Sequence, residues 1–180
     1  TLDEKNSSIE FSGESISSGF YKQLQIAMIA AFILMSIVVF FIFRTFVPGF
    51  AIILSAFADI LMTLVAVNIF GFKILSAGII AFLMLIGYSV DSDILLTTRV
   101  LKTRGESINA RLWSAFKTGM TMTLTSLAAV LVSLFIVSSI SDVLQQIFTI
   151  LTIGLFFDIF NTWITNASIL KWYAEKKRLG

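Results

Sequence analysis

The chain has 180 residues, of which 57% are hydrophobic and only 13% are charged, and its net charge at neutral pH is +2. This composition excludes a soluble globular domain, because too few polar residues are present to cover its surface. There is no Cys and no His, which excludes disulfides and makes a zinc site improbable, although carboxylates alone could bind a hard cation. We expect no cofactor.

The first 19 residues are polar, acidic and rich in Ser, and they lack the basic and apolar segments of a secretory signal. We expect residues 1–19 to be a flexible lead-in or the remnant of an extracytoplasmic domain.

Five apolar runs follow, and each is near the length of about 20 residues that crosses the hydrocarbon core as a helix. Only helices and closed barrels satisfy their backbone hydrogen bonds within lipid, and these runs do not alternate as barrel strands do. The sequence therefore predicts an all-α, polytopic membrane bundle over residues 20–175, followed by a basic tail at 176–180. The predicted spans are 22–43, 47–70, 74–98, 118–138 and 143–170.

The connection at residues 99–117 is strongly basic, with Glu106 as its single acid. Its basic residues are Arg99, Lys102, Arg104, Arg111 and Lys117. Apolar residues recur at helical spacing after Gly105, which favours a short amphipathic helix on the membrane surface. These apolar residues are Ile108, Leu112, Trp113 and Phe116. An equally good interpretation is a solvated basic loop that sets the topology.

The distribution of Lys and Arg predicts the orientation. If the 99–117 loop lies in the cytoplasm, Arg44 and the C-terminus lie there too. Ten of the thirteen basic residues are then on the cytoplasmic side. The N-terminal stretch then lies outside a cell membrane that the chain crosses several times.

Four carboxyl groups lie within the predicted spans, where an ionisable side chain is costly and by default indicates a functional site. Asp59 has Ser55 and Thr63 one turn before and after it on the same helix face. Asp158 heads a polar stripe at the spacing of one helix face, which must contact protein or water. The members of this stripe are Asn161, Thr162, Thr165 and Asn166.

Asp91 and Asp93 interrupt the third apolar run. Gly87, one turn before Asp91, would let a neighbouring helix approach the carboxyl, and Tyr88 could donate a hydrogen bond to it. Asp93 points about 200° away around the helix, so we expect the two acids not to share a site. Asp93 could instead pair with Arg99 or another base of the loop.

Asp91 is therefore the first proton-relay candidate, followed by Asp158 and Asp59. The alternative for each of them is a carboxyl that only joins helices by hydrogen bonds. The fourth span carries small and hydroxylated residues along one stripe, which we interpret as a surface for tight helix packing. This stripe comprises Thr118, Thr121, Thr125, Ala128 and Ala129.

Residues 86–99, which read Ile-Gly-Tyr-Ser-Val-Asp-Ser-Asp-Ile-Leu-Leu-Thr-Thr-Arg, resemble the fourth-helix signature of the SecF family of protein-export membrane proteins. Residues 121–127 and 158–163 resemble later helices of that family, the last more closely in archaeal members. The resemblance covers about residues 20–175. It implies a six-helix bundle of the resistance–nodulation–division type with a large external domain. The five spans would be its second to sixth, and the chain a fragment without the first helix and most of that domain.

The resemblance also implies a function without enzymatic activity. Members act with SecD and use the proton gradient to help translocated proteins leave the Sec channel. The implied partners are SecD, the channel, the unfolded substrate protein and the lipid bilayer, but no nucleic acid. Bacterial members usually have Asn-Asp where this chain has Asp91-Ser92, so the acid is shifted by one position. Asp91 lines up instead with the Asp of the related SecD motif.

Three other functions remain open. A related exporter or sterol-sensing-type domain would have the same helical scaffold. An intramembrane aspartyl protease would need two acids that share a proton, which Asp91 and Asp158 could supply, although the Gly-x-Gly-Asp pattern of such proteases is absent. In a purely structural partner, the acids would only hold helices together.

Overall fold

The structure is a computed structural model that describes residues 18–72, 76–103 and 105–177. Within these residues the chain is helical and has no strand. Of the predicted lead-in at 1–19 and the predicted tail at 176–180, residues 1–17 and 178–180 lie outside the described part, as does Arg104. The helices are α2 (Ser18–Phe43), α3 (Phe46–Ile69), α4 (Ser76–Lys102), α5 (Ile108–Val137), α6 (Asp142–Phe160), the π-helical segment η1 (Asn161–Asn166) and α7 (Ala167–Lys176).

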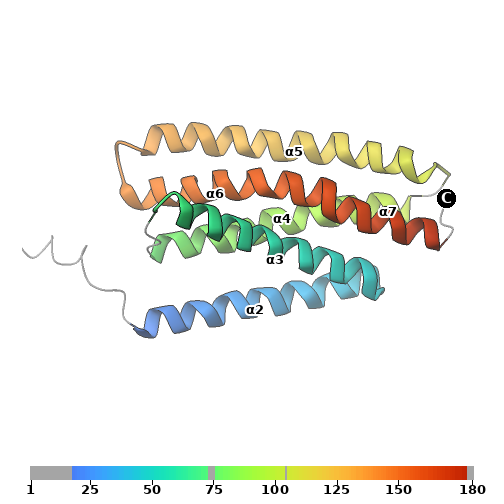
Figure 1. The fold of residues 1–180 in the computed structure, drawn as a ribbon, viewed down its shortest axis with the longest axis horizontal. Coiled ribbons are helices and arrows are strands. Elements are labelled where there is room, and N and C mark those ends of the chain that lie inside the picture. Colours follow the sequence, from blue (N-terminus) through green and yellow to red (C-terminus); the bar gives the residue numbers. More distant parts are fainter. Residues whose placement is uncertain (1–17, 73–75, 104, 178–180) are drawn as a thin grey trace, which may run out of the picture.

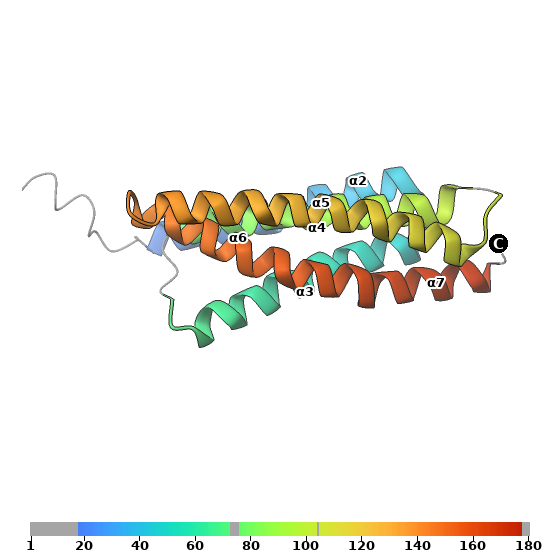
Figure 2. The same ribbon diagram turned by 90° about the horizontal axis from the view of Figure 1, so that it is seen from above.

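Five helical rods are long and apolar enough to cross a membrane, with α6, η1 and α7 forming one of them. The predicted all-α bundle with five membrane-crossing helices is thus confirmed. The rods alternate in direction: α4 and α6 contact each other at the centre, α3 and α5 flank them, and α2 packs against α3 on the outside (Figure 1). The turned view shows that α6, η1 and α7 continue as a single rod (Figure 2).

The links between helices are short, which makes consecutive helices antiparallel neighbours. Arg44 in the link between α2 and α3 has a φ of 51°, and Gly105 between α4 and α5 has a φ of 88°. Glycine adopts this left-handed conformation without steric cost. Both links and the end of α7 lie at one end of the bundle, and the link between α5 and α6 lies at the other (Figure 1).

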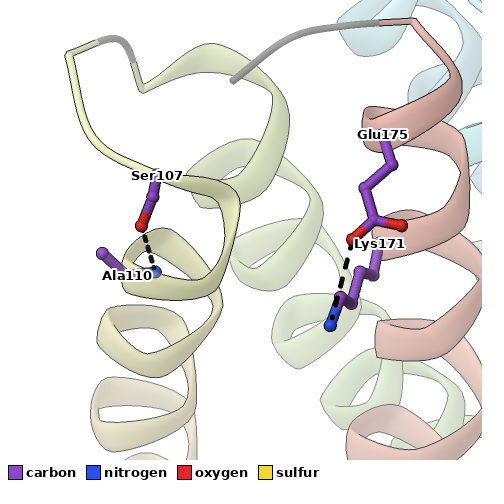
Figure 3. A network of polar contacts seen from close by, with 4 residues as sticks. All are labelled: Ser107, Ala110, Lys171 and Glu175. Atoms are coloured by element: carbon purple, nitrogen blue, oxygen red, sulfur yellow. Dashed lines mark hydrogen bonds and ion pairs between the residues drawn. The ribbon is translucent and has the colours of Figure 1, made fainter.

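The basic segment at residues 99–117 differs from both predicted interpretations. Helix α4 continues to Lys102, and the amphipathic pattern after Gly105 forms the first turns of the 30-residue α5 rather than a separate surface helix. The Ser107 hydroxyl caps α5 by accepting a hydrogen bond of 3.3 Å from the backbone N–H of Ala110 (Figure 3).

Arg111 explains why this segment is neither a solvated loop nor a surface helix. Its side chain is buried and donates hydrogen bonds to the carbonyl oxygens of Val100, at 3.2 Å, and Glu106, at 2.8 Å. Carbonyl groups at the end of a helix lack intrahelical partners and attract cations. The guanidinium therefore fastens the start of α5 to the end of α4. The exposed Lys171 and Glu175 on α7 form an ion pair of 3.9 Å at the same end (Figure 3).

The predicted packing stripe on α5 is wrong for contacts within this chain, because Thr121, Thr125, Ala128 and Ala129 are exposed. The hydroxyls of Thr121 and Thr125 donate to carbonyls of their own helix. Helix α5 packs through another face, where Gly119 lies against the Trp163 ring. A Cβ atom at Gly119 would lie only 2.9 Å from Cη2 of that ring. The large ring thus selects the face that α5 turns inward.

The apolar core between α3, α4 and α6 is built around fully buried aliphatic side chains, among them Ile52, Leu85 and Leu155. Gly154 allows α6 to approach α4, because a Cβ atom there would lie 2.5 Å from Cδ2 of Leu85. This close contact brings the polar faces of α3, α4 and α6 together further along the bundle.

Candidate functional site

Three of the four acids in the spans meet in the interior of the bundle. Asp59 on α3, Asp93 on α4 and Asp158 on α6 are 0%, 0% and 1% exposed. Asp158 lies close enough to interact electrostatically with both of the others. Buried polar groups in lipid must find partners within the protein. The site is therefore defined by what surrounds these three carboxyl groups.

The carboxyl of Asp59 accepts two hydrogen bonds, one from each neighbouring rod. The Ser89 hydroxyl donates to Oδ2 at 2.5 Å, and the Asn161 amide donates to Oδ1 at 3.2 Å. The same amide donates to the backbone carbonyl of Ser55 at 2.6 Å. These contacts join α3 to α4 and to η1.

The carboxyls of Asp93 and Asp158 are bridged by one hydroxyl. Thr162 Oγ1 lies 3.1 Å from Oδ1 of Asp93 and 3.2 Å from Oδ1 of Asp158. A hydroxyl has a single proton, so it can donate to only one carboxylate and can accept from the other only if that group carries a proton. Asn166 donates to Oδ1 of Asp93 at 2.6 Å, and Ser92 lies 3.3 Å from Oδ2 of Asp158. The arrangement is suited to holding a proton shared between two carboxyls.

The π-helical segment η1 positions three of the partner side chains. Asn161 and Asn166 are five residues apart and both buried, together with Thr162. A π-helical turn includes an additional residue, so side chains at this spacing face the same way. Thr165, which we expected on the stripe, is exposed. The expectation was wrong there because it assumed regular α-helical spacing, and the repeat of Asn at a distance of five residues is the signal that could have indicated the π-turn.

Asp91 does not belong to this buried group but lies on the outer face of α4. The expectation that Asp91 and Asp93 occupy separate sites is confirmed. Apart from the nearby backbone of α4 itself, no atom lies within 4 Å of where a Cβ of Gly87 would be, so no other helix of the described chain approaches it. Tyr88, 38% exposed, has no hydrogen bond to Asp91 among the described contacts. At Gly87, Tyr88 and Asp91, this face of α4 is exposed.

An open cavity of about 630 Å³ extends from Asp91 along α4 toward the basic end of the bundle, and α5 contributes Met122 to its lining. Arg99 lines this cavity and donates a 3.0 Å hydrogen bond to Ser114. The expected pairing of Asp93 with Arg99 is therefore wrong, because Asp93 faces the interior while Arg99 ties α4 to α5.

Two chemical alternatives find no support in this geometry. Asp91 and Asp158, the pair that an aspartyl protease would use here, do not meet, since the first faces outward and the second is buried. Among the described residues, no group of three or more His, Cys, Asp or Glu side chains is arranged to hold a metal ion.

Comparisons with known proteins agree with this architecture. The sequence profile of the family described as "Protein export membrane protein SecD/SecF, C-terminal" matches residues 1–176. The chain is 48% identical over 181 residues to a protein-export membrane protein SecF of Methanocaldococcus jannaschii. The matched region covers 99% of the chain and 64% of that relative. For the SecF proteins of Methanolacinia petrolearia and Methanothermobacter thermautotrophicus, the identities are 48% and 45%, with 91% of the chain and 58% of the relative covered in each case.

These relatives are archaeal, as the sequence of the last helix led us to expect. The chain spans about three fifths of the length of the relatives that it matches.

Proposed function

Since this chain belongs to the SecD/SecF family of protein-export membrane proteins and is of the SecF type, we propose that it couples the proton gradient to protein translocation together with SecD. It is a multi-pass membrane protein, as its five apolar rods require. The proposal covers its action as an auxiliary subunit at the Sec channel, where an unfolded protein is the cargo.

The observation that carries the proposal is the bridge from Asp93 through Thr162 to Asp158. Both distances to the bridging hydroxyl are within hydrogen-bond range, and all three side chains are buried. A proton that enters on one carboxyl can pass through the hydroxyl to the other, because the hydroxyl both accepts and donates. Ionisable groups at membrane depth that contact one another are typical of proton relays.

Movement of a proton through this bridge would change the packing between helices. Asp93 lies on α4, Asp158 on α6 and Thr162 on η1, and Asp59 extends the network to α3. A carboxylate accepts hydrogen bonds, whereas a protonated carboxyl also donates one. Each protonation state therefore favours a different set of contacts between these rods, which is the kind of two-state element that a transport cycle needs.

Asp91 has a separate part in the proposal. It lies on the outer face of α4, within the candidate membrane span Gly78–Lys102. An acid there is costly against lipid, and the space at Gly87 leaves room for close approach of another helix. We assign this face to SecD. In the topology that the basic residues favour, the end with the links after α2 and α4 faces the cytoplasm.

The proposal is tested by export in cells whose full-length protein carries Asp91→Asn or Asp158→Asn, each of which keeps the size of the side chain and removes its titration. We expect export to fail while protein level and co-purification with SecD persist. Asp142→Asn, an exposed acid at the start of α6, is the matched control and should export normally.

If Asp91→Asn alone exports normally, Asp91 has no part in coupling. If Asp158→Asn, Asp93→Asn and Asp59→Asn also export normally, the buried acids are only structural and the proposed relay is refuted.

A further inference from the structure

Another open cavity, of about 330 Å³, lies between the first turns of α5 and the last rod. It is separate from the cavity beside Asp91, which lies between α4 and α5. Its wall is mainly aromatic: the rings of Trp113 and Phe116 are stacked with their centroids 5.4 Å apart, and Phe116 meets Trp163 edge to face at 5.1 Å. The other lining residues are Asn109, Leu112, Ala167, Ser168 and Lys171.

The length of α5 indicates the depth of this cavity in the membrane. A helix rises about 1.5 Å per residue, so the 30 residues of α5 span about 45 Å, whereas the hydrocarbon core is about 30 Å thick. The part that fits the core is residues 118–137, because it has no charged side chain, while Arg111 and Lys117 precede it. The α5 residues that line the cavity lie at 109–116. The cavity is therefore at the level of the lipid headgroups, where Trp side chains concentrate in membrane proteins.

The polar groups around the cavity suit an anion. Lys171 lines it, and the ammonium of Lys117 lies 5.5 Å from the centre of the Trp113 ring in its wall. Asn109 adds an amide that can donate hydrogen bonds. None of the lining residues named above is acidic.

The ion pair of Lys171 with Glu175 leaves this ammonium available. Its 3.9 Å separation is long, and the two side chains are 44% and 57% exposed (Figure 3). An exposed pair of this kind contributes little to stability. A phosphate in the cavity can therefore replace or share the carboxylate as the partner of Lys171.

We propose that this cavity binds one anionic phospholipid of the surrounding bilayer. Its phosphate lies beside Lys171 and Asn109, and the first part of its hydrocarbon chains covers the aromatic wall. Basic pockets between membrane helices bind anionic headgroups in this way. A soluble anion would meet the same charges but would leave the aromatic rings facing water, which is unfavourable. The bound lipid contacts α5 and α7 together, so it joins these two rods at the basic end of the bundle.

This inference goes beyond the proposed function and does not depend on it, because lipid binding is measured without export. The test uses the full-length protein, purified in detergent micelles and mixed with phosphatidylglycerol, which is anionic, or phosphatidylcholine, which is zwitterionic, with identical chains. Native mass spectrometry counts the lipids that stay bound as each lipid is titrated, and gives their dissociation constants. We expect one phosphatidylglycerol per chain, bound more tightly than phosphatidylcholine.

Two substitutions of lysine on α7 separate the cavity from general attraction to a basic surface. Lys171→Gln removes the charge in the cavity and should weaken binding of phosphatidylglycerol about fivefold, the effect of one basic residue near an anionic lipid. Lys176→Gln is the matched control. Lys176 is exposed on the same helix, and its ammonium lies 4.9 Å from the centre of the Trp172 ring, outside the cavity. The control should bind phosphatidylglycerol as the unaltered protein does.

Ser168→Phe tests the cavity without changing any charge. Ser168 is exposed, so the fold tolerates a larger side chain there. The new ring occupies space that the lipid needs, and the preference for phosphatidylglycerol over phosphatidylcholine should disappear.

Three results would overturn the proposal. The first is equal affinity for the two lipids in the unaltered protein. The second is an equal loss in Lys171→Gln and Lys176→Gln, because the lipid would then be attracted by the basic end as a whole. The third is displacement of the lipid by glycerol 1-phosphate, which has the headgroup phosphate without the chains, since the site would then take a soluble phosphate.

Discussion

Replacing Asn161 by Ala tests whether the buried polar network holds the bundle together. The Asn161 amide donates to the Ser55 carbonyl, the Ser55 hydroxyl and Oδ1 of Asp59. Interhelical hydrogen bonds in membrane proteins contribute about 0.6 kcal/mol each on average, which gives about 1 kcal/mol for the two protons that the amide can donate. Oδ1 of Asp59 would also lose this donor in a fully buried position, and a buried group left without its partner costs about 1–3 kcal/mol.

We therefore expect Asn161→Ala to lower the free energy of unfolding by about 2–4 kcal/mol. The measurement is the reversible unfolding of the full-length protein in mixed micelles, followed by circular dichroism as denaturing detergent is added. Asn68→Ala is the matched control, because Asn68 is exposed and its side chain makes no hydrogen bond in the described structure. It should change stability by less than about 0.5 kcal/mol.

A loss below about 0.5 kcal/mol in Asn161→Ala would refute this reasoning, since surface substitutions alone produce changes of that size. A second check comes from Ser89, which donates to the other oxygen of Asp59. The double variant Asn161→Ala with Ser89→Ala should be non-additive, because both side chains share Asp59 as partner. Strict additivity would mean that the two hydrogen bonds do not belong to one network.

Other substitutions test the packing. Gly154→Ala should destabilise the bundle by about 1–3 kcal/mol, because the new Cβ would overlap Leu85. At Gly87 the space is open, so Gly87→Ala should leave the stability of the isolated chain unchanged or raise it by up to about 1 kcal/mol. Equal effects on the unfolding midpoint would contradict the described contact between α4 and α6. Arg111→Met should cost at least about 2 kcal/mol, since two charge-assisted hydrogen bonds to carbonyl groups are lost. The exposed Lys117→Met should cost less than about 0.5 kcal/mol, and similar losses in both variants would show that Arg111 does not join α4 to α5.

Hydrogen bonds at this site combine residues that are far apart in the sequence. Asn161 meets Ser55 and Asp59 across more than 100 positions, and Asn166 meets Asp93 across 73. Spacing along one helix can place a side chain on a face, but it contains no information on which other helix covers that face. For this reason the sequence leaves a base of the 99–117 loop as a possible partner of Asp93, whereas in the structure its partners are Thr162 and Asn166 of η1.

The same limit explains the outcome for α5. The stripe of Thr and Ala residues has the composition of a packing surface, yet it is exposed. Gly119 and Trp163 determine which face of α5 packs inward, because the large ring on one helix fits only where the other helix has no side chain. Complementarity of this kind exists only between two helices, so it cannot be predicted from either one alone.

The sequence by itself determined the class of protein, the number of membrane-crossing helices and the short links that make them antiparallel. These properties depend on hydrophobicity and length, which are local and are set by the thickness of the bilayer. It also located the four acids within the spans. Only the tertiary structure decided that Asp59, Asp93 and Asp158 lie together while Asp91 faces outward, because rotation of each helix about its axis is set by packing against its neighbours. The π-helical turn at residues 161–166 also contributes to this arrangement, because it turns Asn161 and Asn166 toward the buried acids.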